Sequence, residues 1–298
     1  MIKQLTHTNA REIVAALNHE RQALGPASGM VLTLIVVASP EHFVSVFAAA
    51  MEAGRAHPSR IIVCSYEPDA ESGLDADLHF GESIPGDLIV LRFKGELVPH
   101  ADSVVLPLLL PDAPAVVWWP YDAPADLSTD PLGSLATRRI TDAVTASDPL
   151  AALAVRVENA APGDTDLTWT RITPWRALLA AALDQYPCVP TSAVVEAAAD
   201  NAPAALLAAW LQLRLDIPVK HVANEGPGIT GVRMEAATGE VAIVREDGFM
   251  ATYIIPGQVR RSVALKRRSV PQLITEELQR MDPDDILEDV LASMRKAS

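Results

Sequence analysis

The stretch that decides the fold is Met30-Val-Leu-Thr-Leu-Ile-Val-Val-Ala38, followed by Ser39-Pro40-Glu41 and later by Arg60-Ile-Ile-Val-Cys-Ser-Tyr66. The first and last runs are apolar and rich in β-branched residues, as in strands that are buried on both faces. Between them, apolar residues recur at helical spacing from Phe43 to Met51, and Gly54 ends the segment. Strand, helix and strand in this order predict a βαβ unit with two parallel strands and a right-handed crossover.

Ser39 lies where the first of these strands ends, which is the edge at which open α/β sheets bind ligands. With Pro40 and Glu41 it has the pattern of an N-cap, a first-turn proline and a first-turn acid. A helix N-terminus can also receive an anion, so Ser39 is a candidate anion-binding residue as well as a plain cap.

The rest of the first half continues the α/β pattern. Asp69 to Gly86 is acidic and contains glycine, and we expect a loop there. Either Ser147 or Asp148 as the cap, with Pro149 in the first turn, predicts the start of a helix that runs through Val157. Further strands are expected over three apolar runs, namely Leu88–Leu97, Ser103–Leu110 and Ala115–Trp119.

The second half has a different character. Ala161–Asp166 resembles a linker, and it separates an N-terminal domain over 1–162 from a C-terminal domain over 167–298. From Gly231 onward, short strands alternate with turns, which predicts a β-meander followed by helices. The predicted fold class is therefore α/β with two domains. The first has a parallel βαβ-containing sheet flanked by helices, and the second is α+β with a C-terminal meander and helices.

Composition excludes several classes of protein. The chain has 298 residues, a net charge of −14 and 49% hydrophobic residues, which argues against a disordered chain or a nucleic-acid-binding surface. Its longest apolar run, Met30–Ala38, is far shorter than the ~20 residues of a membrane span. The N-terminus has no secretory signal, so we expect a cytoplasmic protein.

The sequence contains no recognisable catalytic or metal-binding motif, and we expect no cofactor and no metal. Gly226-Pro-Gly228-Ile-Thr-Gly231 spells a dinucleotide fingerprint, but a hairpin follows it instead of a helix, so a glycine-rich connection is the better interpretation. Cys64 lies in an apolar strand and Cys188 in a loop. We expect both thiols to be reduced, inert and dispensable.

Two clusters of arginine and tryptophan are candidate partner-binding surfaces. Tryptophan and arginine are the residue types that most often dominate interface energetics. The first cluster surrounds Pro174, where Thr173 is expected to cap a helix, and contains Trp169, Arg171, Trp175 and Arg176. The second cluster is a local basic segment in an acidic chain, and contains Arg260, Arg261, Arg267 and Arg268. A structural role is the alternative for every member, with the tryptophans filling an interdomain seam.

Several segments together point to a family. They are His57-Pro-Ser-Arg60, Trp118-Trp119-Pro120, Arg138-Arg139-Ile-Thr-Asp142, Leu167–Arg176, and the ending from Pro256-Gly257 through Leu265–Arg268 to Met281-Asp-Pro. In this order they resemble the glucose-6-phosphate dehydrogenase assembly protein family, OpcA, of actinobacteria and cyanobacteria. The resemblance implies a cytoplasmic, non-catalytic protein that binds glucose-6-phosphate dehydrogenase and raises its activity in the oxidative pentose phosphate pathway. It supplies no catalytic residue to carry over.

Three hypotheses follow. The first is the dehydrogenase partner that the resemblance implies. The second is an enzyme or sensor for a sugar phosphate, with its site at the Ser39 edge of the N-terminal sheet. The third is a two-domain scaffold for an unrelated partner. A dehydrogenase assay with and without the protein separates the first hypothesis from the other two.

Overall fold

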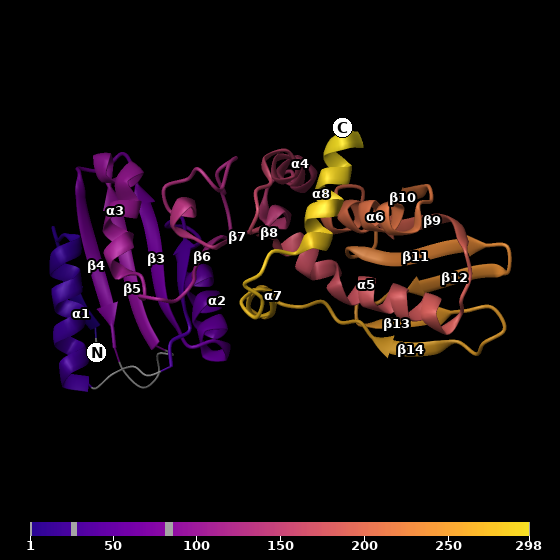
Figure 1. The fold of residues 1–298 in the computed structure, drawn as a ribbon, viewed down its shortest axis with the longest axis horizontal. Helices are drawn as coiled ribbons and strands as arrows, with labels where there is room; N and C mark the ends of the chain where they lie inside the picture. The colour runs from indigo at the N-terminus through magenta and orange to yellow at the C-terminus, as the bar shows by residue number, and fades with distance from the viewer. Residues whose placement is uncertain (1, 25–28, 81–85, 298) are drawn as a thin grey trace. The chain divides into compact units, whose positions relative to one another are not determined.

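The computed structural model describes residues 2–24, 29–80 and 86–297, which form two compact units (Figure 1). Unit 1 consists of 1–142, 161–165 and 270–283, and unit 2 of 143–160, 166–269 and 284–298. The contiguous domains 1–162 and 167–298 stay a prediction. The compact units differ from them because 143–160 packs in unit 2 and 270–283 packs in unit 1.

Unit 1 is built on an eight-stranded sheet with the order β1-β4-β5-β3-β2-β6-β7-β8. Neighbouring strands from β5 to β7 are parallel, and the pairing of Leu34 with Ile61 confirms the predicted parallel βαβ unit. The chain leaves β2 toward β3 on one side and later returns to β6 on the other, so the strand order reverses between β2 and β6. The strands are β1 (Ile2–Leu5), β2 (Leu32–Val37), β3 (Ser59–Glu67), β4 (Gly73–His79), β5 (Gly86–Lys94), β6 (Ala115–Trp119), β7 (Arg138–Thr141) and β8 (Asp164–Asp166).

Helices cover both faces of this sheet. Ile35 and Ile62 pack in one cluster with α1 (Ala10–Leu24) and α3 (Ala101–Val105). The alternating residues of β2 and β3 point to the opposite face, where α2 (Phe43–Ala56) contacts β3 and α7 (Val270–Glu277) packs beside α2. Burial on both faces explains why the deciding strands are continuously apolar.

Two predictions for unit 1 were wrong. Residues 69–86 contain strand β4, because Leu74, Ala76 and Leu78 alternate with aspartates that pair with β5. Residues 81–85 of that expected loop lie outside the described residues. The run Ser103–Leu110 is helical instead of extended, since α3 continues into a 3₁₀ turn over Leu106–Leu108.

Unit 2 is built on a six-stranded sheet with the order β10-β9-β11-β12-β13-β14, in which only the β9–β10 pair is parallel. The antiparallel run from β11 to β14 confirms the predicted meander. Its strands are β9 (Pro190–Ala197), β10 (Val219–Ala223), β11 (Ile229–Ala236), β12 (Gly239–Val244), β13 (Met250–Ile254) and β14 (Arg261–Ala264). The helices of unit 2 are α4 (Pro149–Asn159), α5 (Leu167–Gln185), α6 (Ala202–Leu215) and α8 (Asp285–Ala297).

Helix α5 begins earlier than predicted. Asp166 is its N-cap and accepts a hydrogen bond from the Thr168 amide at 2.8 Å, so the expected cap at Thr173 was wrong. Pro174 lies inside the helix and has no N–H to donate to the carbonyl of Thr170, one turn earlier. The guanidinium of Arg268 donates to that carbonyl instead. A distant side chain therefore compensates for a helix-breaking residue.

Candidate partner-binding site

All eight arginines and tryptophans predicted to bind a partner lie in unit 2. Trp169 and Trp175 are each 2% exposed and belong to the hydrophobic core of this unit. The indole N–H of Trp169 donates to the Asp284 carboxylate at 2.8 Å, which attaches α5 to the start of α8. The structure therefore gives both tryptophans a packing role.

Arginines stack on both tryptophan rings. The guanidinium of Arg176 lies 3.5 Å from the centre of the Trp169 ring, and Arg176 also donates to the Thr173 hydroxyl at 3.1 Å. The guanidinium of Arg245 lies 5.0 Å from the centre of the Trp175 ring. Such cation–π contacts stabilise a positive charge against the face of an aromatic ring. Arg171 lies half-buried on the same helix.

Arg245 was missed by sequence analysis. Arg245 directly follows β12, and it is 5% exposed. Its guanidinium donates to the carbonyls of Leu265 and Ile229 at 2.8 Å each. Burial, together with the nearby charge of Arg267, lowers the pKa of Arg245 to about 10. Val241, Ala242 and Ile243 are all fully buried, so no inside–outside alternation in the local sequence singles out Arg245.

The basic segment around β14 divides into two parts. Arg268 is half-buried through its bond to α5. Arg267 lies against the glycine-rich turn, where a Cβ added to Gly228 would meet Nη2 of Arg267 at 2.8 Å. Gly228 has a φ of +71° and precedes strand β11, which confirms a glycine-rich connection at this point.

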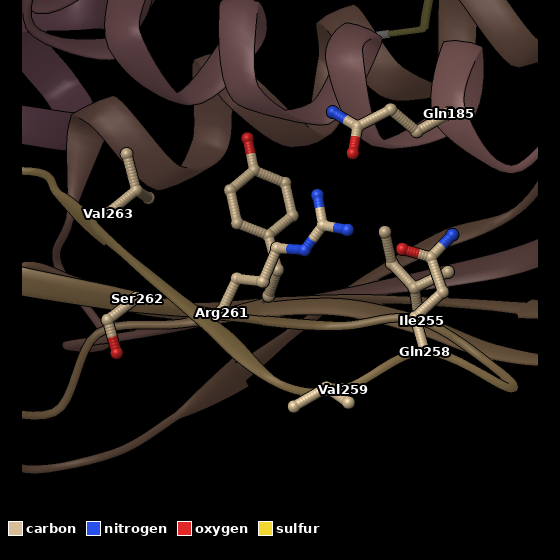
Figure 2. Close-up of a pocket in the computed structure, with 8 residues that line it drawn as sticks. Gln185, Ile255, Gln258, Val259, Arg261, Ser262 and Val263 are labelled. Carbon is tan, nitrogen blue, oxygen red and sulfur yellow. The ribbon is translucent and has the colours of Figure 1, made fainter.

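The exposed cations gather at the β14 edge of the sheet. Arg260, Arg261, Lys266 and Arg267 are exposed, and within the described parts of the chain their side chains make no hydrogen bond or ion pair. A cavity of about 180 Å³ lies beside β14. Figure 2 shows the Arg261 guanidinium at this cavity, pointing toward Gln185 of α5. This combination of unpaired charge and open space can accept an acidic group.

Ser39 has a different setting from the one predicted. Helix α2 begins at Phe43, and its N-cap position is His42, so the expectation that Ser39 caps this helix was wrong. The Ser39 hydroxyl lies 2.9 Å from Nδ1 of His42, whose ring stacks on Tyr121 with centroids 3.8 Å apart. These residues follow β2 and β6, where the strand order reverses. Anion binding at Ser39 stays a prediction.

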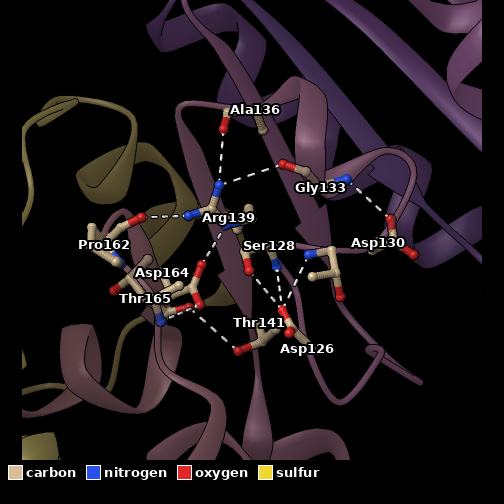
Figure 3. A network of polar contacts seen from close by, with 12 residues as sticks. Asp126, Ser128, Asp130, Gly133, Ala136, Arg139, Thr141, Pro162, Asp164 and Thr165 are labelled. Atoms are coloured by element: carbon tan, nitrogen blue, oxygen red, sulfur yellow. Dashed lines mark hydrogen bonds and ion pairs between the residues drawn. The ribbon is translucent and has the colours of Figure 1, made fainter.

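Three buried arginines of unit 1 form ion pairs. Arg60 pairs with Asp87 at 3.0 Å and Arg138 with Glu277 at 2.5 Å. Arg139 pairs with Asp164 at 2.5 Å and donates to the carbonyls of Pro162 and Ala136 (Figure 3). All three arginines are buried, so the Arg138-Arg139 motif connects chain segments of unit 1.

The two cysteines are free thiols in different surroundings. Cys64 is fully buried in β3, and burial raises the pKa of its thiol. Cys188 is half-buried in the connection after α5. No cluster of histidine, cysteine and acidic residues with metal-binding geometry occurs in residues 2–24, 29–80 and 86–297, and no helix there is both long and apolar enough to cross a membrane.

Known proteins resemble the chain in sequence and in fold. A 3-ketoreductase, KijD10 of Actinomadura kijaniata, solved with TDP-benzene and NADP, superposes with a TM-score of 0.50 at 12% identity, over 89% of this chain and 95% of that one. An oxidoreductase of Sinorhizobium meliloti also gives a TM-score of 0.50, at 10% identity over 90% and 95% of the two chains. At these identities the likeness concerns the fold alone.

Sequence comparison is more specific. A Synechocystis protein described as a putative OxPP cycle protein OpcA is 30% identical over 141 residues, which are 43% of this chain and 30% of that protein. Residues 50–158 match the glucose-6-phosphate dehydrogenase subunit N-terminal domain, and residues 162–291 match the C-terminal domain of the same subunit. The chain belongs to the OpcA family of glucose-6-phosphate dehydrogenase assembly proteins.

Proposed function

We propose that this protein is a non-catalytic assembly factor that binds glucose-6-phosphate dehydrogenase in the cytoplasm and raises its activity. The observation that carries the proposal is the match of residues 50–158 and 162–291 to the two domains of a glucose-6-phosphate dehydrogenase subunit. The match spans residues of both compact units.

The residues at the strand-order reversal of unit 1 support a non-catalytic role. Dinucleotide-binding folds place a glycine-rich turn after the first strand, so that backbone amides approach the pyrophosphate. In the sheet of unit 1, the turn that follows β2 at the strand-order reversal is Ala38-Ser39-Pro40-Glu41-His42. It has no glycine, its proline has no amide donor, and Glu41 adds a negative charge. These residues do not fit a dinucleotide bound in that way.

Activation by a non-catalytic partner has a defined energetic requirement. The partner must bind the active conformation or assembly of the dehydrogenase more tightly than the inactive one. A tenfold gain in activity corresponds to only ~1.4 kcal/mol of such preference. A few interface residues are enough to supply it.

The exposed cations of unit 2 are the residues we assign to this contact. The whole chain carries a charge of −14, so a local positive surface orients an approaching acidic partner. Arg260, Arg261 and Arg267 are exposed at this surface. Trp169 and Trp175 support it from within, because they pack α5 into the core of the unit, and Arg176 lies over the Trp169 ring.

The experiment is a titration of glucose-6-phosphate dehydrogenase with this protein, measuring the rate at fixed substrate. Wild type is compared with Arg261→Glu and Arg267→Glu, with Arg214→Glu on α6 as a control of equal charge change on an exposed site. We expect the wild type to raise the rate to a plateau. For Arg261→Glu and Arg267→Glu, the protein concentration that gives half of the plateau rate should be about tenfold higher, since each variant loses a charge-assisted contact.

Two outcomes contradict the proposal. One is an unchanged rate at saturating wild-type protein without a complex in analytical ultracentrifugation. The other is dehydrogenase or other oxidoreductase turnover by this protein alone. Equal effects of all three charge changes would show that total charge matters instead of the β14 surface.

A further inference from the structure

Strand β14 is an edge strand with free backbone positions. Among the described residues it pairs only with β13, at one end of the sheet order. The Leu265 amide donates to the Phe249 carbonyl at 2.8 Å, and hydrogen-bonded pairs in an antiparallel ladder recur every second residue. Val263 and Arg261 therefore direct their backbone groups toward β13. Ser262 and Ala264, which are both exposed, direct theirs outward.

Charge surrounds this edge. Arg261 opens β14 and Arg260 directly precedes it, while Lys266 and Arg267 follow its end. A segment paired with β14 would therefore meet positive charge at both ends of the strand.

The cavity beside β14 offers a place for one side chain of such a segment. Tyr253, Ile255 and Val263 form apolar walls, while Gln185, Gln258 and Arg261 supply polar groups (Figure 2). Arg261 pairs in register with Tyr253, which places its side chain on the α5 face, where the cavity lies. In the described chain, the side chains of Gln185 and Gln258 form no hydrogen bond. Amide and guanidinium donors around a small space fit a carboxylate.

We propose that β14 binds an extended acidic segment of a protein partner by strand addition, with one acidic side chain of that segment in the cavity. Main-chain hydrogen bonds from Ser262 and Ala264 would supply affinity, and the cavity and flanking arginines would select acidic residues. The inference deepens the proposed function and rests on it only for the identity of the partner. Basic residues on an edge strand also protect against aggregation, and the test separates the two roles.

The test uses the full-length protein and a fluorescein-labelled octapeptide of alternating glutamate and threonine, followed by fluorescence anisotropy. Ser262→Pro removes an outward amide and leaves the β13 ladder intact, while Ser262→Thr keeps the amide as its control. Arg261→Glu is compared with Arg214→Glu. We expect Ser262→Pro and Arg261→Glu each to weaken binding about tenfold and both controls to stay within about twofold of wild type.

Hydrogen exchange provides a second measurement. Strand addition should slow exchange of the Ser262 and Ala264 amides when the peptide binds, because both become donors in a new ladder. Absence of binding, equal binding of the matching glutamine peptide, or an unchanged affinity in folded Ser262→Pro would each overturn the inference. If Arg261→Glu weakened peptide binding and Ser262→Pro did not, charged side chains would hold the peptide without strand addition. This result would also overturn the inference.

The dehydrogenase titration separates this inference from the proposed function. Activation by wild type and equally by Ser262→Pro would refute strand addition and leave the proposed function in place. Peptide binding with protected amides, but no complex with the dehydrogenase, would refute the proposed function and leave strand addition in place.

Discussion

The arginines of the two units are stabilised in different ways. In unit 1, Arg60, Arg138 and Arg139 are buried, and each meets a carboxylate within 3.0 Å. In unit 2, Arg245 is equally buried, but the side-chain bonds it makes within the described residues are to two carbonyls, and it lies over a tryptophan ring. The ion pair of Arg233 with Glu196 in unit 2 is partly exposed.

The two kinds of arginine differ in whether a carboxylate inside the unit neutralises their charge. A carboxylate cancels the field of a buried arginine, whereas carbonyls and an aromatic ring only offset part of its desolvation. In unit 1 each of these buried arginines meets a carboxylate, and Asp87 is shared between Arg60 and Arg21. Unit 2 combines Arg245 with the exposed cations of β14, and under the proposed function we expect an acidic partner to contact this unit.

The cysteines provide the largest expected contrast between the units. Cys64 in unit 1 is fully buried with a raised thiol pKa, and Cys188 in unit 2 is half-buried. Reaction requires a thiolate that the reagent can reach, so Cys64 should react at least about a thousandfold more slowly than Cys188, and only through unfolding. Stopped-flow labelling with a disulfide reagent measures both rates, and Cys64→Ala and Cys188→Ala assign them. Two fast thiols in the native protein would contradict the buried position of Cys64.

The next contrast concerns ion pairs. Glu277→Ala leaves Arg138 buried without its carboxylate and should lower the free energy of unfolding by about 3–5 kcal/mol. Glu240→Ala removes a partner of Arg233 whose side chain is 34% exposed, and should cost about 0–1 kcal/mol. Urea unfolding measures both values. Equal losses would show that burial does not distinguish the ion pairs of the two units.

The fold was more predictable from the sequence than the site. Continuous apolar strands and turn spacing correctly predicted the parallel βαβ unit and the meander, because burial on two faces and tight turns leave local patterns. The start of α5 was predicted wrongly, because Pro174 normally opens a helix and its compensation by Arg268 is a long-range contact. Arg245 was missed for the same reason, since the chain positions that satisfy it, Leu265 and Ile229, are distant in sequence.

A backbone substitution tests whether the position of Arg267 depends on the glycine-rich turn. Gly228 has a φ of +71°, and a Cβ there would lie 2.8 Å from Nη2 of Arg267. Gly228→Ala should cost about 1 kcal/mol through the left-handed backbone alone. The long side chain of Arg267 can move away, so partner binding should change more than stability. Thermal unfolding and the dehydrogenase titration measure the two effects, and unchanged values in both would contradict the contact.

The smallest expected effect is that of Arg267→Gln, which should raise the free energy of unfolding and weaken activation of the dehydrogenase. The charge of Arg267 contributes to lowering the folded-state pKa of Arg245 below its value in the unfolded chain. A cation with a lowered folded pKa is destabilising throughout the range below that pKa, and the penalty is relieved only as the pH rises through about 10. At pH 7, Arg267→Gln should therefore raise the free energy of unfolding by up to about 0.5 kcal/mol, and added salt should reduce the gain.

The same change should weaken activation of the dehydrogenase, as expected where charge is retained for binding at a cost in stability. Urea unfolding at low and high salt, beside the dehydrogenase titration, measures both. Loss of stability together with unchanged activation would make Arg267 a structural residue, and the contrast between the two units would then rest on Arg260, Arg261 and Lys266.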